Sequence, residues 1–109
     1  MIQFADSKPL YIPGTLVQHR RYHYRGLIVA YDLQCQAPSG WYENNQTQPP
    51  RQQPWYHVLV HATETTTYAA QDSLLTDTAG LPISHPLLDL YFDVWKDGRY
   101  VRNKMPWTL

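Results

Sequence analysis

The sequence is poor in cysteine and contains no long apolar run. Its single cysteine, Cys35, excludes an internal disulfide and a cysteine-rich zinc site. No apolar stretch is long enough to cross a bilayer, and the segment from Met1 to Asp6 lacks the basic start and apolar run of a secretion signal. We therefore expect a cytoplasmic protein with no membrane partner. The 109 residues fit one domain, 1–109.

An excess of charge of either sign is also missing. Nine Lys and Arg residues balance nine Asp and Glu residues, so the formal net charge is zero. Proteins that hold DNA without sequence preference usually carry a large positive excess, because neutralised phosphates supply most of that affinity. Any affinity of this chain for nucleic acid must therefore come from a local patch.

Motifs typical of catalysis are absent from the sequence. There is no Gly-rich phosphate loop and no Gly-x-Ser-x-Gly turn. The carboxylates are scattered singly, so the sequence offers no acid/base pair. These absences weaken an enzymatic interpretation, and we predict no catalytic residues and no cofactor.

Tyrosine and tryptophan are abundant where phenylalanine is rare. Nine Tyr and four Trp accompany two Phe, and rings with a polar tip suit half-buried sites and contact surfaces. We take Trp41, Tyr42, Trp55 and Tyr56 as candidates for an aromatic contact surface. The alternative is that each of these rings is simply packed over or inside a small barrel.

Two β-hairpins are predicted from strand-forming runs separated by turn residues. The first joins a strand over 15–24 to a short apolar strand over 27–31 through a turn at Arg25 and Gly26. The second joins strands over 55–62 and 65–70 through a turn near Thr63 and Glu64. Residues 71–75 then resemble a one-turn connector.

A long loop is predicted over 35–54, between the two hairpins. Gln, Asn, Pro and Ser dominate this segment, and Pro49, Pro50 and Pro54 prevent regular strand pairing. Trp41 and Tyr42 are its only large rings, and they indicate that part of the loop docks on the body of the protein.

The spacing of apolar residues predicts a C-terminal helix over 84–98. Ser84 or His85 can cap its start, Pro86 fits the first turn, and Gly98 can end it. The apolar stripe of this helix is made of Leu87, Leu88, Tyr91, Phe92 and Trp95. A short basic extended tail over 99–103 follows. The predicted fold class is therefore mainly β, with two hairpins in a small curled sheet and one C-terminal α-helix.

Four runs of this sequence resemble a known family. HRRYHYRGLIVAYDLQC (19–35), QPWYHVLV (53–60) and YAAQDSL (68–74) are similar to the YccV-like hemimethylated-DNA-binding domain, also found as HspQ-type proteins. ISHPLLDLYFDVWKDGRYVRN (83–103) resembles the version of this domain at the C-terminal end of certain F-box proteins. The four runs span most of the chain, in the family's order and at compatible spacing.

The resemblance implies a compact SH3-like β-barrel and a cytosolic protein. It also implies two roles, which are the binding of hemimethylated DNA and service as an adaptor or specificity factor for protein degradation after heat stress. Self-association as a homo-oligomer belongs to the bacterial branch of the family. No catalytic residues are implied for this chain.

A cationic cluster follows the start of the first predicted strand. On a strand, His19, Arg21, His23 and Arg25 would share one face while Arg20 takes the other, and guanidinium groups pair well with phosphates. If the tail folds beside the first hairpin, the patch gains Arg99, Arg102 and Lys104. We take these residues as candidates for DNA binding. The alternative is a solvated strand face that keeps the protein soluble.

The histidines are candidates for a metal site, and Cys35 is a candidate nucleophile. His57 with His61, and His19 with His23, share strand faces, but no carboxylate or cysteine supports either pair at a suitable spacing, so we predict no metal site. Cys35 is either a nucleophile or a small buried hydrophobe. Asp32, in contrast, is expected to fix the end of the second strand through local backbone hydrogen bonds.

Three functional hypotheses follow. The first is a non-catalytic hemimethylated-DNA-binding protein, which takes first place because the family is defined by that activity. The second is a protein-interaction adaptor with a protease or its substrates as partners, and physical arguments alone rank it equal to the first. The third is a metal-dependent or cysteine enzyme.

Overall fold

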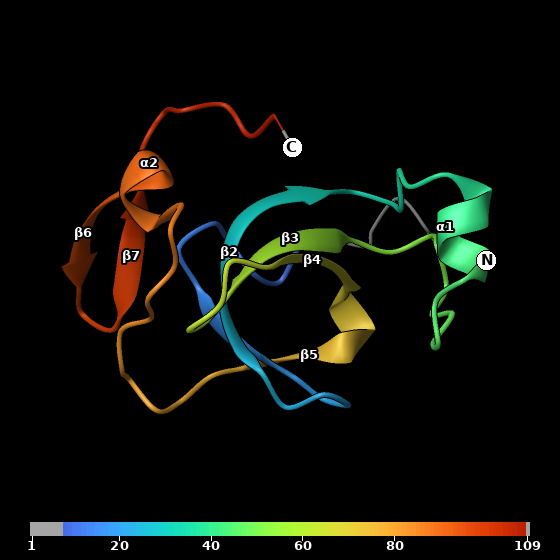
Figure 1. Ribbon diagram of the computed structural model, residues 1–109, viewed down its shortest axis with the longest axis horizontal. Coiled ribbons are helices and arrows are strands. Elements are labelled where there is room, and N and C mark those ends of the chain that lie inside the picture. The colour runs from blue at the N-terminus through green and yellow to red at the C-terminus, as the bar shows by residue number, and fades with distance from the viewer. Residues whose placement is uncertain (1–7, 109) are drawn as a thin grey trace.

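The structure is a computed structural model that describes residues 8–108, and it is built on antiparallel sheets (Figure 1). Five strands form the main sheet in the order β4-β3-β2-β1-β5, and β6 and β7 form a second, two-stranded sheet. The prediction of a mainly β fold is confirmed. The main strands are β1 (Leu16–His19), β2 (Arg25–Asp32), β3 (Trp55–Val60), β4 (Thr66–Ala70) and β5 (Leu74–Thr76).

The predicted second hairpin is present as β3 and β4. Its strands pair from Trp55 with Ala70 to Leu59 with Thr66. The turn lies near Thr63, as predicted. The hydroxyl of Thr63 holds it together by donating to the carbonyl of Val60 and accepting the N–H of Thr65. The predicted connector is confirmed over Gln71–Ser73 as a 3-10 turn, after which β5 begins at Leu74.

The predicted first hairpin is present, but its turn lies earlier than expected. The chain reverses just after His19, with His23 in the left-handed region at a φ of 64°, so the turn predicted at Arg25 and Gly26 is wrong. Gly26 is instead a strand residue that lets β3 approach closely. A Cβ atom at this position would lie 2.3 Å from Cγ1 of Val58.

The predicted C-terminal helix over 84–98 is wrong. Only one helical turn, α2 (Leu88–Tyr91), forms there, and it is followed by a hairpin of β6 (Phe92–Lys96) and β7 (Arg99–Arg102). The reason lies in Asp97 and Gly98, which both have positive φ, 54° and 78°. Asp-Gly is a favoured two-residue turn between paired strands, so these residues reverse the chain where a helix stop was expected.

Both faces of the main sheet are covered by apolar side chains. Strand alternation sends Val17, Ile28, Tyr56 and Val58 into the concave side of the curl. The other face packs against the C-terminal hairpin, which therefore completes the core. This second cluster contains Leu16, Leu27, Val29, Leu59, Ile83, Tyr91, Phe92 and Tyr100.

The predicted long loop over 35–54 contains a five-residue helix, α1 (Ser39–Glu43). Trp41 lies on this helix and packs edge-on against Trp55, with ring centroids 6.2 Å apart. Tyr42 donates its hydroxyl to the carbonyls of Gln48 and Pro49. The expectation that this loop docks on the body is confirmed, and Figure 1 shows α1 at the end of the molecule opposite β6 and β7.

The main sheet curls but is not closed by pairing between its edges. β4 and β5 are the two edge strands and have no pairing with each other among the described residues. An SH3-like barrel therefore stays a prediction. Among residues 8–108, no helix has the length and apolar character needed to span a membrane.

We predict that Gly14→Ala destabilises the protein strongly. Gly14 links the two sheets, because its N–H donates to the carbonyl of Ile28 and its carbonyl accepts the N–H of Tyr100. Its φ is 102°, and a Cβ atom would lie 2.0 Å from the carbonyl oxygen of Tyr100. Urea denaturation should show a loss of about 2–4 kcal/mol in the free energy of unfolding.

The matched control for this prediction is Gly40→Ala, in α1. A Cβ atom there meets nothing within 4 Å, and alanine favours a helix over glycine by roughly 0.5–1 kcal/mol. Equal destabilisation by the two substitutions would contradict the role given to Gly14.

Candidate functional site

The β1–β2 turn is shaped by the side chain of His19. The imidazole is buried, and its Nδ1 accepts the backbone N–H groups of Arg21 and Tyr22, each at 3.1 Å. The His19 ring also stacks on Tyr22, with centroids 4.7 Å apart. Burial, followed by the positive charges of His23 and Arg21, lowers the pKa of the His19 imidazole. A neutral acceptor in a buried position therefore orders an otherwise exposed turn.

The turn that His19 supports exposes three cationic or titratable side chains. Arg20, Arg21 and His23 are all exposed, and the guanidinium of Arg21 lies 5.7 Å from the ring centroid of Tyr22. Among residues 8–108, neither Arg20 nor Arg21 has a carboxylate within ion-pair distance. The predicted strand face that joined His19, Arg21, His23 and Arg25 is wrong, because only His19 and Arg25 belong to strands.

The other predicted cations have different surroundings. Arg25 is paired with Asp77, its Nε lying 2.7 Å from the carboxylate. Arg102 donates its Nε to the carbonyl of Val29, at 2.8 Å. Val29 is the extra residue of a β-bulge in β2, so the guanidinium satisfies a carbonyl that strand pairing leaves free. Both side chains stabilise the fold in this way.

Arg99 lies apart from the β1–β2 turn. Its neighbour Tyr100 bonds to Gly14, before the start of β1, whereas the turn follows the opposite end of β1. The intervening extended chain spans roughly 16 Å. Arg99 and Lys104 are exposed. The tail packs beside the first hairpin at the end away from the β1–β2 turn, so it does not extend the cationic patch as predicted (Figure 1).

Of the four predicted contact rings, two are sealed in the core. Trp55 and Tyr56 are 1% and 0% exposed, and the Tyr56 hydroxyl donates to Oε1 of Gln71. Tyr42 is half-buried, whereas Trp41 is 39% exposed. The predicted aromatic surface is therefore reduced to Trp41 with part of Tyr42, and the simple packing alternative holds for the other two rings.

Trp41 forms part of a groove of about 420 Å³ that the sequence did not reveal. This volume lies within the range of about 300–1,000 Å³ usual for ligand sites. Rings, hydroxyls and amides line it, with no Lys, Arg, Asp or Glu among the lining residues. The lining consists of His19, Tyr22, Tyr24, Trp41, Asn45, Gln46, Thr47, Pro49, Trp55, His57, Thr66, Thr67, Tyr68, Ala69, Ala70, Ser73 and Trp107.

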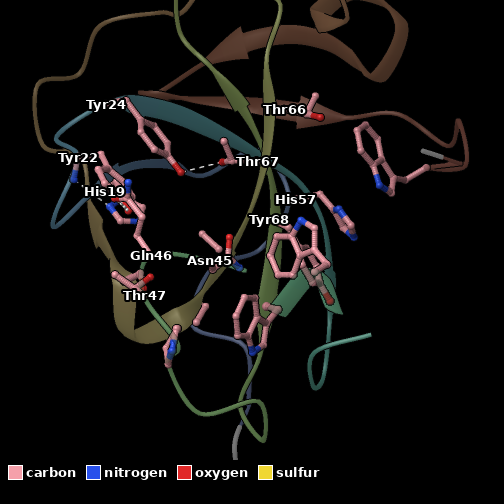
Figure 2. Close-up of a pocket in the computed structure, with 17 residues that line it drawn as sticks. His19, Tyr22, Tyr24, Asn45, Gln46, Thr47, His57, Thr66, Thr67 and Tyr68 are labelled. Carbon is pink, nitrogen blue, oxygen red and sulfur yellow. Dashed lines mark hydrogen bonds between the residues drawn. The ribbon is translucent and has the colours of Figure 1, made fainter. Parts of the chain in front are cut away.

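Two hydrogen bonds define one wall of this groove. The Tyr22 hydroxyl donates to Oε1 of Gln46 at 3.1 Å, which ties the β1–β2 turn to the loop after α1. The Tyr24 hydroxyl and Oγ1 of Thr67 are 2.7 Å apart, which ties the end of the β1–β2 turn to β4. Figure 2 shows Tyr22, Tyr24 and Gln46 on one side of the strand that carries Thr67.

The opposite wall is a stack of rings around His57. The His57 ring centroid lies 4.5 Å from that of Tyr68 and 5.3 Å from that of Trp107. Figure 2 places His57 and Tyr68 across the strand from Tyr24. The groove thus joins side chains from segments far apart in the sequence.

A carboxylate behind the ring wall fixes its geometry. The Tyr68 hydroxyl donates to Oδ2 of Asp32 at 2.6 Å, and Nε2 of His57 lies 3.4 Å from the same oxygen. The expectation that Asp32 acts through local backbone hydrogen bonds is therefore wrong. Burial raises the pKa of Tyr68, with a further contribution from Asp32, and burial lowers the pKa of His57 against the attraction of Asp32. Both groove rings are neutral near pH 7.

The structure shows the surroundings of the histidines considered as metal ligands and of Cys35, considered as a nucleophile. No group of three His, Cys, Asp or Glu side chains suited to a metal occurs within residues 8–108. His61 accepts the backbone N–H of Ser84 through Nδ1, and His57 faces Asp32. Cys35 is buried against Trp55 and Ala70, as expected for a small hydrophobe.

Several residues of the groove were not predicted from the sequence, above all Tyr22, Tyr24, Tyr68 and Trp107. The alternation of histidine and tyrosine over 19–24 was a visible signal. Residues 19–24 were predicted as part of one continuous strand. The turn that brings Tyr22 to Gln46 was therefore not predicted. No local pattern indicated Trp107, because its neighbour His57 lies 50 residues earlier in the sequence.

Comparison with known proteins gives one family and one group of relatives. A family model described as hemimethylated DNA-binding protein YccV like matches residues 10–99, which confirms the resemblance. F-box only protein 21 of Homo sapiens is 33% identical over 96 residues, covering 85% of this chain and 15% of that protein. The proteins of that name from Pongo abelii and Mus musculus give the same identity and coverage. The chain thus spans a small part of these relatives, and no solved structure matches it significantly.

We predict that Arg102 is needed for stability. Arg102→Gln removes the guanidinium from the Val29 carbonyl and from the carbonyl of Asn103, and should lower the free energy of unfolding by about 2–3 kcal/mol. Arg99→Gln, on the same strand but exposed, should change it by less than about 0.5 kcal/mol. Denaturation curves of both variants test this, and similar losses would contradict the assignment.

We also predict that the protein loses stability on mild acidification. Burial lowers the pKa of His19 in the folded protein, so the unfolded chain takes up the proton more readily as the pH falls below about 6.5. The stabilisation is present above that pH and is lost below it, with His57 contributing in the same direction. The free energy of unfolding should therefore decrease between about pH 7.5 and pH 5.0.

His19→Gln is the variant that tests the origin of this pH dependence. Its Oε1 can still accept the two turn N–H groups but does not titrate. The variant should show a shallower dependence of stability on pH than the natural chain. An unchanged slope would exclude His19 as a contributor.

Proposed function

The chain belongs to the YccV-like family of hemimethylated DNA-binding proteins, and from this membership we propose that it binds hemimethylated duplex DNA without catalysing a reaction. The observation that carries the proposal is the family match over residues 10–99, which includes strands β1 to β6 and the β1–β2 turn. The family is described by binding, and the exposed cations of the β1–β2 turn support the proposal.

The β1–β2 turn is the proposed contact with the DNA backbone. Arg20, Arg21 and His23 are exposed together on it, and Arg20 and Arg21 lack carboxylate partners among residues 8–108. Guanidinium groups that make no hydrogen bonds within the protein can form bidentate hydrogen bonds with phosphate oxygens. Arg25 and Arg102 are left out of the proposed contact, because Asp77 and the carbonyl of Val29 occupy them.

Tyr22 is the proposed sensor of the methyl group. It stands between Arg21 and His23 and is 47% exposed, so its ring is accessible beside the cations. Discrimination of a methylated strand requires an apolar contact with a methyl group at a base edge in the major groove. Stacking on His19 holds the ring in place, which reduces the entropy lost on binding.

The zero net charge bears on the strength of this interaction. With nine positive and nine negative side chains, the protein as a whole does not attract DNA, so the affinity must come from a local patch, which we place at the turn. Two or three phosphate contacts imply a log–log salt slope of about −2 to −3. This is a shallow dependence for a DNA-binding protein.

A protein-interaction adaptor is the second candidate function. The observation that favours it is the groove, whose lining residues include no Lys, Arg, Asp or Glu and so offer no permanently charged group to a phosphate. Rings with polar tips are favoured anchors at protein contacts. The similarity to part of F-box only protein 21 is compatible with a module that works inside larger proteins.

DNA binding is tested by titrating the protein into unmethylated, hemimethylated and fully methylated duplexes of one sequence. Binding is measured by fluorescence anisotropy at two salt concentrations. We expect the hemimethylated duplex to bind most tightly. Replacement of Arg20 and Arg21 by alanine should weaken all three complexes about tenfold or more and reduce the salt slope by about two. Equal weak binding of the three duplexes would remove the specific claim.

Two single substitutions separate the proposed roles. Arg99→Ala removes an exposed arginine from the other hairpin and should leave DNA affinity unchanged. An effect as large as that of the turn arginines would show that the contact surface includes β7. Tyr22→Ala should reduce the preference for hemimethylated DNA while the salt slope stays the same, because the ring carries no charge.

A further inference from the structure

The outer edge of β4 offers unpaired backbone groups to the groove. In an antiparallel pair, alternate residues direct their N–H and C=O groups toward the partner strand. The N–H of Val60 bonds to the carbonyl of Thr65, and the N–H of Gln71 bonds to that of Pro54, so odd-numbered residues of β4 face β3. Thr66 and Tyr68 therefore direct their backbone groups outward, and these groups have no hydrogen-bond partner among residues 8–108.

This edge lacks the features that usually protect an edge strand. Natural proteins block exposed edges with lysine, proline, bulges or very short strands. β4 has the sequence TTYAA, pairs with β3 without a bulge and is five residues long. The other edge strand, β5, has only three residues. An unprotected edge of this kind is suited to pairing with another chain.

The groove surrounds this edge on both sides. All five residues of β4 line it. Tyr22 and Tyr24 lie on one side of the strand, and His57 and Tyr68 lie on the other (Figure 2). A chain lying along β4 would therefore meet rings with its alternate side chains, which point to opposite sides of the sheet. Ala70 is buried and marks the inner end of the groove.

We propose that this groove binds an extended peptide segment of another protein, which pairs with the outer edge of β4 as an additional strand. The proposal rests on the second candidate function, the adaptor role, and deepens it by naming the surface and the type of partner. Pairing with Thr66 and Tyr68 provides up to four backbone hydrogen bonds. The segment in the groove is uncharged, since the lining carries no Lys, Arg, Asp or Glu.

Charge complementarity specifies one end of the peptide. Tyr22 lines the groove, and its neighbours Arg20 and Arg21 are exposed at the mouth without carboxylate partners among residues 8–108. An acidic residue flanking the uncharged segment at this end would pair with them. The partner is thus an extended, uncharged segment of about three to five residues that is preceded or followed by Asp or Glu.

The shape of the groove favours a single segment over a second copy of this chain. The loop over 45–49 stands opposite the β4 edge, and Gln46 is tied to the β1–β2 turn through Tyr22. A second sheet approaching edge to edge would meet this wall, whereas one extended strand can lie between the wall and β4. Duplex DNA would find neither a phosphate partner nor a complementary edge inside the groove.

The test starts from a random phage-displayed dodecapeptide library, selected on the full chain in the presence of nuclease. The most enriched peptide is synthesised, and its affinity is measured by fluorescence anisotropy. We expect enriched sequences with an uncharged extended segment next to Asp or Glu. Methylation of single peptide nitrogens should weaken binding about tenfold at every second residue and have little effect at the residues between.

Thr66→Pro is the matching change in the protein. It removes an outward N–H without touching the bonds to β3, and we expect it to weaken the peptide about tenfold. Thr78→Pro, at an exposed loop residue outside the groove, is the control and should bind as the natural chain does. The N-methyl scan does not depend on a variant, so it remains decisive if Thr66→Pro does not fold.

Several results would overturn the proposal. They are the absence of any enriched peptide, an N-methyl scan without a two-residue period, or equal affinity of Thr66→Pro and Thr78→Pro for the peptide. Loss of DNA binding in Thr66→Pro would assign the edge to nucleic acid instead. A dimer that dissociates on the same substitution, seen by sedimentation, would assign it to a second copy. Failure of the methylation-state titration alone would leave the peptide proposal standing, because the two measurements use different ligands.

Discussion

The acceptance of two backbone N–H groups by the buried imidazole of His19 shapes the functional surface of this protein. Without this acceptor, the residues between β1 and β2 would have no internal partner for these donors. The same ring stacks on Tyr22, whose hydroxyl reaches Gln46 in the loop after α1. One side chain therefore orders the cationic turn and, through Tyr22, one wall of the groove. The bond requires a neutral imidazole, which burial favours.

The C-terminal hairpin gives the curled sheet a second packed face. A two-stranded hairpin alone is at best marginally stable in water. Here β6 and β7 pack Phe92 and Tyr100 into one cluster with Leu27 and Leu59 of the main sheet. The hairpin is fastened by backbone bonds at Gly14 and by the guanidinium of Arg102 at the β2 bulge. Three of the nine Lys and Arg residues, Arg25, Arg51 and Arg102, bond to groups within the fold. Six of the nine remain exposed, and of these Arg20 and Arg21 lie in the turn that is proposed to contact DNA.

The two proposed binding surfaces adjoin at Tyr22. Its neighbours carry the positive charge proposed to contact DNA, whereas its hydroxyl belongs to the wall of the uncharged groove. The two surfaces differ in chemistry. The turn offers exposed cations that suit phosphates, and the β4 edge offers fixed backbone donors and acceptors that suit another polypeptide. The protein can present both surfaces together because residues of β4 and of the β1–β2 turn line the same groove.

The sequence by itself determined four of the five strands of the main sheet, β1 to β4, the docking of the loop around Trp41 and the family, whereas β5 fell partly in the segment taken as a connector. These follow from local patterns, namely β-branched and aromatic runs between turn residues, and from matching runs along the chain. It did not determine the C-terminal hairpin, because Leu87 to Trp95 fit helical spacing as well as a helical turn followed by a strand. Only the tertiary structure decided which cations are free and which rings are sealed, since Asp77 and the Val29 bulge meet their partners, Arg25 and Arg102, across long stretches of chain. Local sequence carries no record of such distant contacts, so the groove had to be found in the folded protein.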